Sequence, residues 1–288
     1  MTDRKVLTLQ DISCLGQCSL TVALPIISAC GVETIILPSA VLSTHTGGFS
    51  GFTFRDLTED LPGIMKHWQK EGLLFDCLYT GYLGSVTQIE YVYDLREKLL
   101  KDNSPLIVDP AMADHGRLYT GFDQNFVEHM GELCGKADII LPNLTEAALI
   151  TNTEYIAGFQ EESYILKLLE KLGALGAKNV ILKGINYKPG TKSATPHDQL
   201  GIAIYDCTTK DLQYYFHEKQ PHNSHGTGDC FASAFTGALM QGKTMFEAAR
   251  LAADFVVACL KATKGDENHR YGVKFERALP MLVQELNR

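Results

Sequence analysis

The sequence predicts an α/β fold, a three-layer α/β/α sandwich around a mostly parallel central sheet. Short, almost wholly apolar runs such as Leu106-Ile107-Val108 and Ile139-Ile140-Leu141 are typical of strands buried on both faces of a parallel sheet. Longer helical stretches alternate with these runs, and that alternation implies right-handed crossovers with helices on both faces. No repeat, linker or low-complexity tract divides the 288 residues, so we expect a single domain over 1–288.

The first half of the chain alternates strands and helices. We expect strands at 6–9, 33–37, 76–80, 106–109 and 139–141, and helices at 20–30, 56–70 and 86–101. Gly31 closes the first helix, because glycine readily adopts the left-handed conformation that ends helices. Pro38 ends the second strand, and a glycine-rich loop over 43–51 follows.

The second half begins with helices near 145–150 and 162–175 and a strand at 180–183. Residues 184–198 are polar and contain Pro189-Gly190, which predicts a loop or flap. The segments 201–206 and 212–218 alternate apolar and polar residues, as in an antiparallel pair with one exposed face. Helical stretches over 228–262 and 274–287 complete the chain.

Composition narrows the function classes. The net charge is −8 and no basic run is longer than a few residues, which argues against nucleic acid and anionic membranes as partners. No apolar run approaches the length of a membrane span, and no signal-peptide core follows the N-terminus. Eight scattered cysteines without a CxxC pair are typical of buried free thiols, so we expect a cytoplasmic protein.

Polar residues close several of the predicted strands. They are Asp11, Thr80-Gly81-Tyr82, Asp109, Asn143 and Lys183. Ligands of such sheets collect beyond the carboxyl ends of the strands, so these residues are expected to line one edge.

A glycine-punctuated turn, His225-Gly226-Thr227-Gly228-Asp229, runs directly into an apolar helix. Two glycines allow the backbone amides to turn toward one point, and the helix adds its positive N-terminal end, so the turn can hold an anion such as phosphate. Asp229 then places a carboxylate beside that anion, as a general base in phosphoryl transfer requires. The alternative is an ordinary helix start in which Asp229 is an N-terminal helix residue.

Two further motifs follow apolar strands. Asp109-Pro110 stands after Leu106-Ile107-Val108, and Pro110 keeps Asp109 out of helical conformation. Asn143 and Glu146 have the spacing of a capping box. They are either a local helix cap or, together with Asp109, hard oxygen ligands for Mg²⁺, held directly or through water.

Five motifs together resemble the ribokinase-like superfamily and, within it, the pyridoxal kinases. They occur in the family's order across nearly the whole chain: Thr80-Gly81-Tyr82-Leu83-Gly84-Ser85, Asp109-Pro110-Ala111-Met112, Asn143-Leu144-Thr145-Glu146, Val180-Ile181-Leu182-Lys183 and Gly226-Thr227-Gly228-Asp229. The stretches Gly81–Ser85 and Ser43–Thr46 point to the pyridoxal branch.

The resemblance implies ATP-dependent transfer of a phosphoryl group to the 5′-hydroxymethyl group of a B6 vitamer, in salvage of pyridoxal phosphate. Asp229 would be the general base, and the amides of Gly226, Thr227 and Gly228 would form the anion hole. Glu146, Asn143 and Asp109 would position Mg²⁺ on ATP. Lys183 would lie near the nucleotide, although a lysine at a strand end is often merely solvated. The resemblance also implies a homodimer and allows for a monovalent cation such as K⁺.

The vitamer side is expected to involve residues of the first strands and the 43–51 loop. Tyr82 and His45 suit packing against a flat pyridine ring, although either is also consistent with an ordinary core or loop residue. Thr46 neighbours His45, and Asp11 or Ser13 could hydrogen-bond ring substituents. Many pyridoxal kinases have serine where this chain has Asp11, so an acidic residue here could favour a protonated ring nitrogen or a hydroxyl donor, or could shift selectivity among vitamers.

Two alternatives stay open. A hydroxymethylpyrimidine kinase of thiamine metabolism shares the fold, the ATP site and a flat heteroaromatic substrate. A non-catalytic vitamer-binding protein would retain the fold, but it would have no need of a base such as Asp229.

Overall fold

The computed structural model describes residues 4–186, 199–221, 224–266 and 269–287. The chain divides into two compact units. Unit 1 consists of Met1–Pro105 and Gln220–Arg288, and unit 2 consists of Leu106–Lys219. Among the described residues, no helix combines the length and the apolar character that a membrane span needs.

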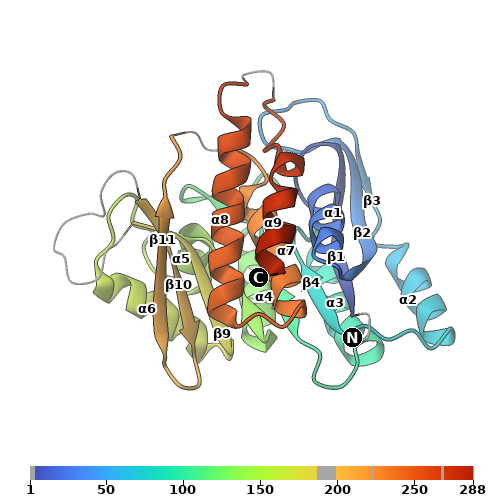
Figure 1. Ribbon diagram of the computed structural model, residues 1–288. Coiled ribbons are helices and arrows are strands. Elements are labelled where there is room, and N and C mark those ends of the chain that lie inside the picture. The colour runs from blue at the N-terminus through green and yellow to red at the C-terminus, as the bar shows by residue number, and fades with distance from the viewer. Residues whose placement is uncertain (1–3, 187–198, 222–223, 267–268, 288) are drawn as a thin grey trace. The chain divides into compact units, whose positions relative to one another are not determined.

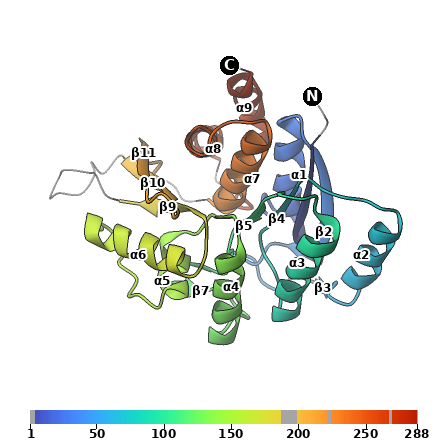
Figure 2. The same ribbon diagram turned by 90° about the horizontal axis from the view of Figure 1, so that it is seen from below.

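Unit 1 is a sheet covered by helices on both faces. Its strands run in the order β4 (Cys77–Thr80), β1 (Lys5–Leu15), β2 (Glu33–Thr44) and β3 (Phe54–Asp56), with β1 parallel to both β4 and β2. Helices α2 (Leu61–Lys70) and α3 (Val86–Leu99) cover one face (Figure 2). The other face carries α1 (Leu20–Ala29), α7 (Thr227–Met240), α8 (Met245–Thr263) and α9 (Leu279–Leu286), and a 3-10 turn spans Phe275–Arg277.

The core of unit 1 explains this layering. Val6, Leu7 and Leu9 are fully buried, so β1 is apolar toward both faces, as a central parallel strand requires. Helices α7 and α8 lie side by side (Figure 1), and Phe235 and Phe255 are fully buried.

Unit 2 carries β5 (Leu106–Val108), β8 (Ile139–Ile140) and β9 (Asn179–Ile185) as parallel neighbours. The strands β10 (Gln199–Asp206) and β11 (Leu212–Glu218) continue this sheet in antiparallel order. A short hairpin of β6 (Ala113–Asp114) and β7 (Arg117–Leu118) lies apart from it. Helices α4 (Gln124–Lys136), α5 (Leu144–Ile150) and α6 (Glu162–Ala174) pack together on one side (Figure 2). The predicted α/β fold class with a mostly parallel sheet is confirmed.

The two first strands are longer than predicted. Pro38 does not end β2 but pairs with Gln10, and the register between β1 and β2 shifts between Gln10 and Ile12. Ser39 and Ala40 therefore lie opposite the single residue Asp11, which is a β-bulge. Because a bulge leaves a backbone group without its usual ladder partner, it lets a strand tolerate the missing N–H of proline. Asp11 thus lies inside β1, not at its end as predicted.

Other boundaries also differ. The helix predicted over 56–70 begins at Leu61, and the stretch 228–262 is two helices separated by the turn at 241–244. The segment 274–287 is likewise divided into the 3-10 turn and α9. Helix α4, strand β3 and the β6–β7 hairpin were not predicted, although Asp123 supplies a cap for α4 by accepting from the Phe126 N–H at 3.0 Å. In the predicted flap, residues 184–185 belong to β9, and residues 187–198 lie outside the described residues.

The core of unit 1 provides a stability test. We expect Phe235→Ala to lower the free energy of unfolding by about 3–5 kcal/mol, because Phe235 is fully buried in α7. The same substitution at Phe54, which is 47% exposed, serves as the control and should change it by less than about 1 kcal/mol. Urea unfolding followed by circular dichroism measures both, and equal losses would contradict this assignment of the core.

Candidate active site

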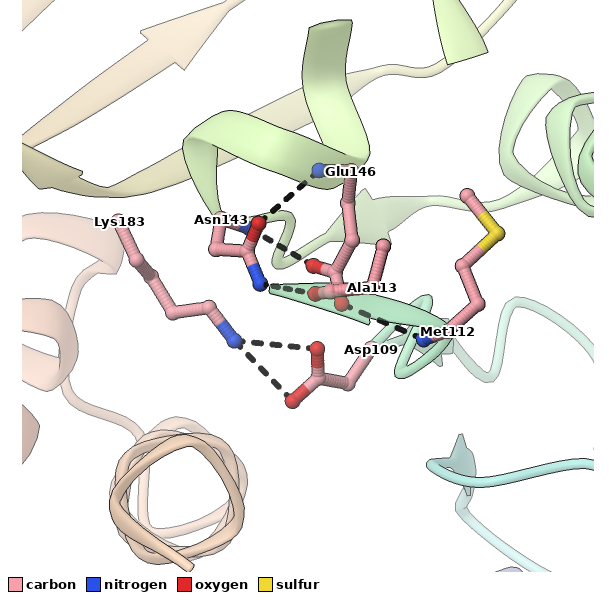
Figure 3. A network of polar contacts seen from close by, with 6 residues as sticks. All are labelled: Asp109, Met112, Ala113, Asn143, Glu146 and Lys183. Carbon is pink, nitrogen blue, oxygen red and sulfur yellow. Dashed lines mark hydrogen bonds and ion pairs between the residues drawn. The ribbon is translucent and has the colours of Figure 1, made fainter. Parts of the chain in front are cut away.

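Unit 2 gathers four of the predicted site residues, which we call the carboxylate cluster: Asp109, Asn143, Glu146 and Lys183 (Figure 3). Asp109 directly follows β5, and Asn143 stands between β8 and α5. Lys183 lies within β9, which runs two residues beyond the predicted end. The Lys183 N–H donates to the Pro142 carbonyl at 2.9 Å, which places Lys183 beside Asn143.

Asn143 and Glu146 form a complete capping box at the start of α5. The Asn143 side-chain oxygen accepts from the Glu146 N–H at 2.9 Å, and the Glu146 carboxylate accepts from the Asn143 N–H at 2.8 Å. The Asn143 side-chain amide also donates to the Ala113 carbonyl at 2.8 Å. The local-cap interpretation is therefore confirmed. The Asn143 side chain donates one hydrogen bond and accepts one.

Asp109 and Lys183 form an ion pair that the sequence did not predict. The Lys183 Nζ lies 3.0 Å and 3.1 Å from the two Asp109 oxygens. The Asp109 side chain is 4% exposed and that of Lys183 is 13% exposed, so the pair is shielded from water. Burial raises the pKa of Asp109, whereas Lys183 lowers it.

Glu146 is a second buried carboxylate in the same cluster. Burial raises the pKa of Glu146 well above its usual range, and the neighbouring Asp109 raises it further. Lys183 acts in the opposite direction, as do the hydrogen bonds from the backbone of Asn143 and Met112. The cluster thus holds two carboxylates and one ammonium group in a buried place, an arrangement that a further cation would stabilise.

The fit of this cluster to Mg²⁺ follows from its donors. Carboxylate oxygens of Asp109 and Glu146 keep lone pairs beyond the hydrogen bonds they accept, and hard oxygen donors suit Mg²⁺. No group of three or more His, Cys, Asp or Glu side chains within the described ranges is arranged to hold a metal. The residues therefore fit an ion held by two carboxylates with several retained waters. Asn143 positions Glu146, and its side-chain oxygen keeps a lone pair beyond the one hydrogen bond it accepts, so a contact of Asn143 with the ion, directly or through water, stays a prediction.

A neighbouring contact set was missed by the sequence reasoning. The Met112 N–H donates to Glu146 at 3.4 Å, and the Gly116 N–H donates to the Thr145 hydroxyl at 3.0 Å. Together with the bond from Asn143 to Ala113, these contacts tie the β6–β7 hairpin to the start of α5. The sequence feature that could have indicated these contacts is Thr145, because its hydroxyl lies inside the capping-box motif but takes no part in the cap.

Unit 1 holds the glycine turn. Gly226 has a left-handed φ of 78°, and a side chain there would place its Cβ 1.6 Å from the Gln17 carbonyl oxygen. Helix α7 begins at the next residue, and Asp229 lies in its first turn. The prediction that glycine is needed is thus confirmed at Gly226, whereas Gly228 is an ordinary member of the helix without a positive φ. The backbone amides of Thr227 and Gly228 stand at the positive end of the helix.

Asp11 and Ser13 lie together on β1. Asp11 is 5% exposed, and the Ser13 hydroxyl donates to it at 2.9 Å. Burial raises the pKa of Asp11, while hydrogen bonds from Ser19 and Ser13 lower it. Burial, together with the negative charges of Asp11 and Asp56, raises the pKa of Tyr82 to about 12.

His45 lies beside the glycine turn, and Thr46 next to it is exposed. The His45 ring is 5.0 Å from the ring of Phe49 and 4.8 Å from that of His225, measured between centroids. Burial lowers the pKa of His45, and His225 lowers it further. The predicted residues thus fall into two sets. The first set, in unit 1, is Asp11, Ser13, His45, Thr46, Tyr82, Gly226, Thr227, Gly228 and Asp229, and the second is the carboxylate cluster of unit 2.

Cys18 is a residue of unit 1 that the sequence reasoning did not single out. Burial raises the pKa of Cys18, and Asp229 and Asp11 raise it further. Cys18 lies in the loop between β1 and α1, so this loop is exposed to the charge of both carboxylates. No pattern in the sequence marks this proximity, because it depends on how the glycine turn packs against Gln17.

Several known proteins are similar to this chain in sequence and in fold. A family model described as phosphomethylpyrimidine kinase matches residues 68–273. Pyridoxal kinase from Lactobacillus plantarum is 31% identical with a TM-score of 0.86, over 98% of this chain and 97% of that one. A Bacteroides thetaiotaomicron protein described as a putative phosphomethylpyrimidine kinase and solved with pyridoxal is 33% identical with a TM-score of 0.88, over 100% of this chain and 96% of that one.

Pyridoxine kinase from Bacillus subtilis is 29% identical over 195 residues, which is 66% of this chain and 66% of that protein, so the match spans about two thirds of this relative. The likenesses define the class as a ribokinase-like α/β protein, as the motifs predicted. The chain belongs to the phosphomethylpyrimidine kinase family, in which its relatives include pyridoxal and pyridoxine kinases.

The ion pair in the cluster can be tested by removing its cation. We expect Lys183→Met to lower the free energy of unfolding by about 3 kcal/mol near neutral pH, because it leaves two buried carboxylates without a counter-charge. Without Lys183 the already raised pKa values of both carboxyls rise further, so protonation relieves the repulsion and the loss shrinks as the pH falls.

The matched control is Lys178→Met, which removes an ion pair to Asp138 whose lysine is 64% exposed. Its effect should stay below about 1 kcal/mol. Urea unfolding at several pH values measures both variants. A loss for Lys183→Met that stays constant or grows toward acid would be incompatible with the described cluster.

The glycine turn can be tested in the same way. Gly226→Ala should lower the free energy of unfolding by at least about 1 kcal/mol more than Gly242→Ala. Both positions have a positive φ, of 78° and 90°, so both variants carry backbone strain. At Gly226 the added Cβ would also collide with the backbone of Gln17. At Gly242 no atom lies within 4 Å of the added Cβ. Equal losses would show that the contact with Gln17 is absent.

Proposed function

We propose that this chain is an ATP-dependent kinase that phosphorylates the 5′-hydroxymethyl group of a B6 vitamer. The observation that carries the proposal is the turn at Gly226, which starts α7 with a carboxylate, Asp229, in its first turn. The likeness to the Lactobacillus plantarum pyridoxal kinase supports the substrate class. The Bacteroides relative solved with pyridoxal supports it as well.

The proposed chemistry assigns a role to each group of residues. The vitamer hydroxyl oxygen attacks the γ-phosphorus of ATP, the bond to the bridging oxygen breaks, and ADP leaves. Asp229 accepts the hydroxyl proton, and the amides of Thr227 and Gly228 stabilise charge on the transferred group. Mg²⁺, held through Asp109 and Glu146, would neutralise charge on the triphosphate. Lys183 orients Asp109 for that task and lowers the pKa of its carboxyl.

A second candidate is a hydroxymethylpyrimidine kinase. The description of the matching family favours it, and the same anion turn and carboxylate cluster would serve it. Cytoplasmic location, a homodimer and a monovalent cation remain predictions from the sequence.

The first test is release of ADP from Mg-ATP, measured with pyridoxal, pyridoxine, pyridoxamine and hydroxymethylpyrimidine in parallel. We expect a B6 vitamer to give the highest kcat/KM. Asp229→Asn should lower kcat by roughly 10²-fold or more while ATP binding persists, because the base is lost and the anion turn is kept. Asp254→Asn on α8, which removes an ion pair to Arg250, is the control and should leave kcat unchanged.

Each other outcome has a defined meaning. Preference for the pyrimidine would assign the second candidate function and leave the roles of the residues standing. Normal turnover by Asp229→Asn would remove that residue as the base. No turnover of any of the four compounds would favour a vitamer-binding protein without catalysis.

A further inference from the structure

Gln88 is a fully buried residue in the first turn of α3, and its side-chain bonds lead away from that helix. The side-chain oxygen accepts from the Gly84 N–H at 2.7 Å. The side-chain NH₂ group donates to the Ser39 carbonyl at 3.0 Å and to the Thr58 hydroxyl at 2.8 Å, and two such bonds are as many as this group can make. One amide therefore joins three separate segments of unit 1.

Capping of α3 does not explain the direction of this side chain. Ser85 is the N-cap of the helix, and its hydroxyl accepts from the Gln88 N–H at 3.3 Å. In a capping box the Gln88 side chain would accept from the backbone N–H of Ser85 in return. It accepts from Gly84 instead, so it holds the loop that precedes the helix.

The segment 81–85 carries Tyr82, and two of its contacts lead to Gln88. The Gly84 N–H donates to Gln88 directly, and the Ser39 hydroxyl, whose residue Gln88 also holds, donates to the Tyr82 carbonyl at 3.3 Å. A Cβ built on Gly84 would lie 3.6 Å from the Gln88 side-chain oxygen and 3.9 Å from a ring carbon of Tyr82. The amide and the aromatic ring thus lie on the same side of Gly84.

The other end of the connection is a fixed part of the sheet. Ser39 is fully buried and lies at the bulge opposite Asp11. Its carbonyl accepts from the Leu57 N–H at 3.0 Å as well as from Gln88. Bulges recur beside active sites, where they redirect a side chain. Gln88 therefore links the loop of Tyr82 to the place where β1 and β2 change register.

We propose that Gln88 is a positioning residue for substrate binding, which holds the Tyr82 ring where a flat heteroaromatic substrate packs on it. This rests on the proposed function, which supplies the substrate class, and on the prediction that Tyr82 packs against the substrate ring. Gln88 acts through the loop and does not touch the substrate. Without its amide, Gly84 loses an acceptor and Ser39 loses a donor, so the loop shifts and carries the ring with it.

The test is a double-mutant cycle on the binding of pyridoxine, measured by isothermal titration calorimetry without ATP. The variants are Gln88→Met, which has a similar length and no amide, Tyr82→Ala, and the two substitutions together. We expect Gln88→Met to weaken binding roughly 5- to 30-fold, the effect of one or two lost hydrogen bonds, and Tyr82→Ala to weaken it at least as much. Because Gln88 acts through Tyr82, adding Gln88→Met to Tyr82→Ala should weaken binding by less than about 2-fold more.

The matched control is Ile89→Ala, at the next residue of α3, which is 1% exposed. It destabilises the same helix by leaving a cavity but keeps the bonds of Gln88, so pyridoxine affinity should change by less than about 2-fold. Independent losses that multiply in the double variant would overturn the proposal. So would unchanged binding by either single variant, or an equal loss in Ile89→Ala. If Gln88→Met does not fold, Gln88→Glu, which keeps an acceptor for Gly84 but loses the NH₂ donor, takes its place in the cycle with the same expected coupling.

Binding separates this inference from the proposed function. Coupled losses in a chain that binds pyridoxine but transfers no phosphoryl group would refute the kinase and keep the role of Gln88. Vitamer turnover with independent effects of the two substitutions would do the reverse. If the wild-type chain binds hydroxymethylpyrimidine and not pyridoxine, the cycle is measured on that ligand, and binding of neither compound would overturn the inference.

Discussion

The sharing of one ammonium group by two buried carboxylates is the constraint on which the rest of unit 2 depends. Lys183 touches both oxygens of Asp109, and Asp109 in turn raises the pKa of Glu146. When both carboxyls are ionised, such a cluster carries an excess negative charge in a place with little water to screen it. Its stability therefore depends on the hydrogen bonds that reach the carboxylates from the backbone, and it is poised to gain from a cation.

Glu146 shows how this constraint extends into the fold. One of its oxygens closes the capping box of α5, and the other accepts from Met112. The same residue thus starts a helix, anchors the approach to the β6–β7 hairpin and contributes the second negative charge. A residue that combines these duties cannot be replaced without changing all of them. For this reason the cap and the metal-ligand interpretations of Asn143 and Glu146, which are alternatives in the sequence, are compatible in the structure.

The carboxylate cluster was largely predictable because Asp109, Asn143 and Lys183 follow or end apolar runs, and parallel strands bring such positions to one edge. The Asp109–Lys183 pair was not predictable, because 74 residues separate its members and only the strand order joins them. The bulge opposite Asp11 has the same origin, since it is a property of the pairing of β1 with β2. Motifs within one short segment could be predicted from the sequence, whereas features formed by two distant segments could not.

The two sets of site residues differ in how their charge is balanced. In unit 2, a lysine partly neutralises the carboxylates, which suits a small divalent ion surrounded by water. In unit 1, the hydroxyls of Ser13 and Ser19 are bonded to Asp11, and no ion pair among the described residues includes it. The described surroundings of the two sets therefore differ in kind: an ammonium group balances the carboxylates of unit 2, whereas only hydroxyl groups are bonded to Asp11 in unit 1.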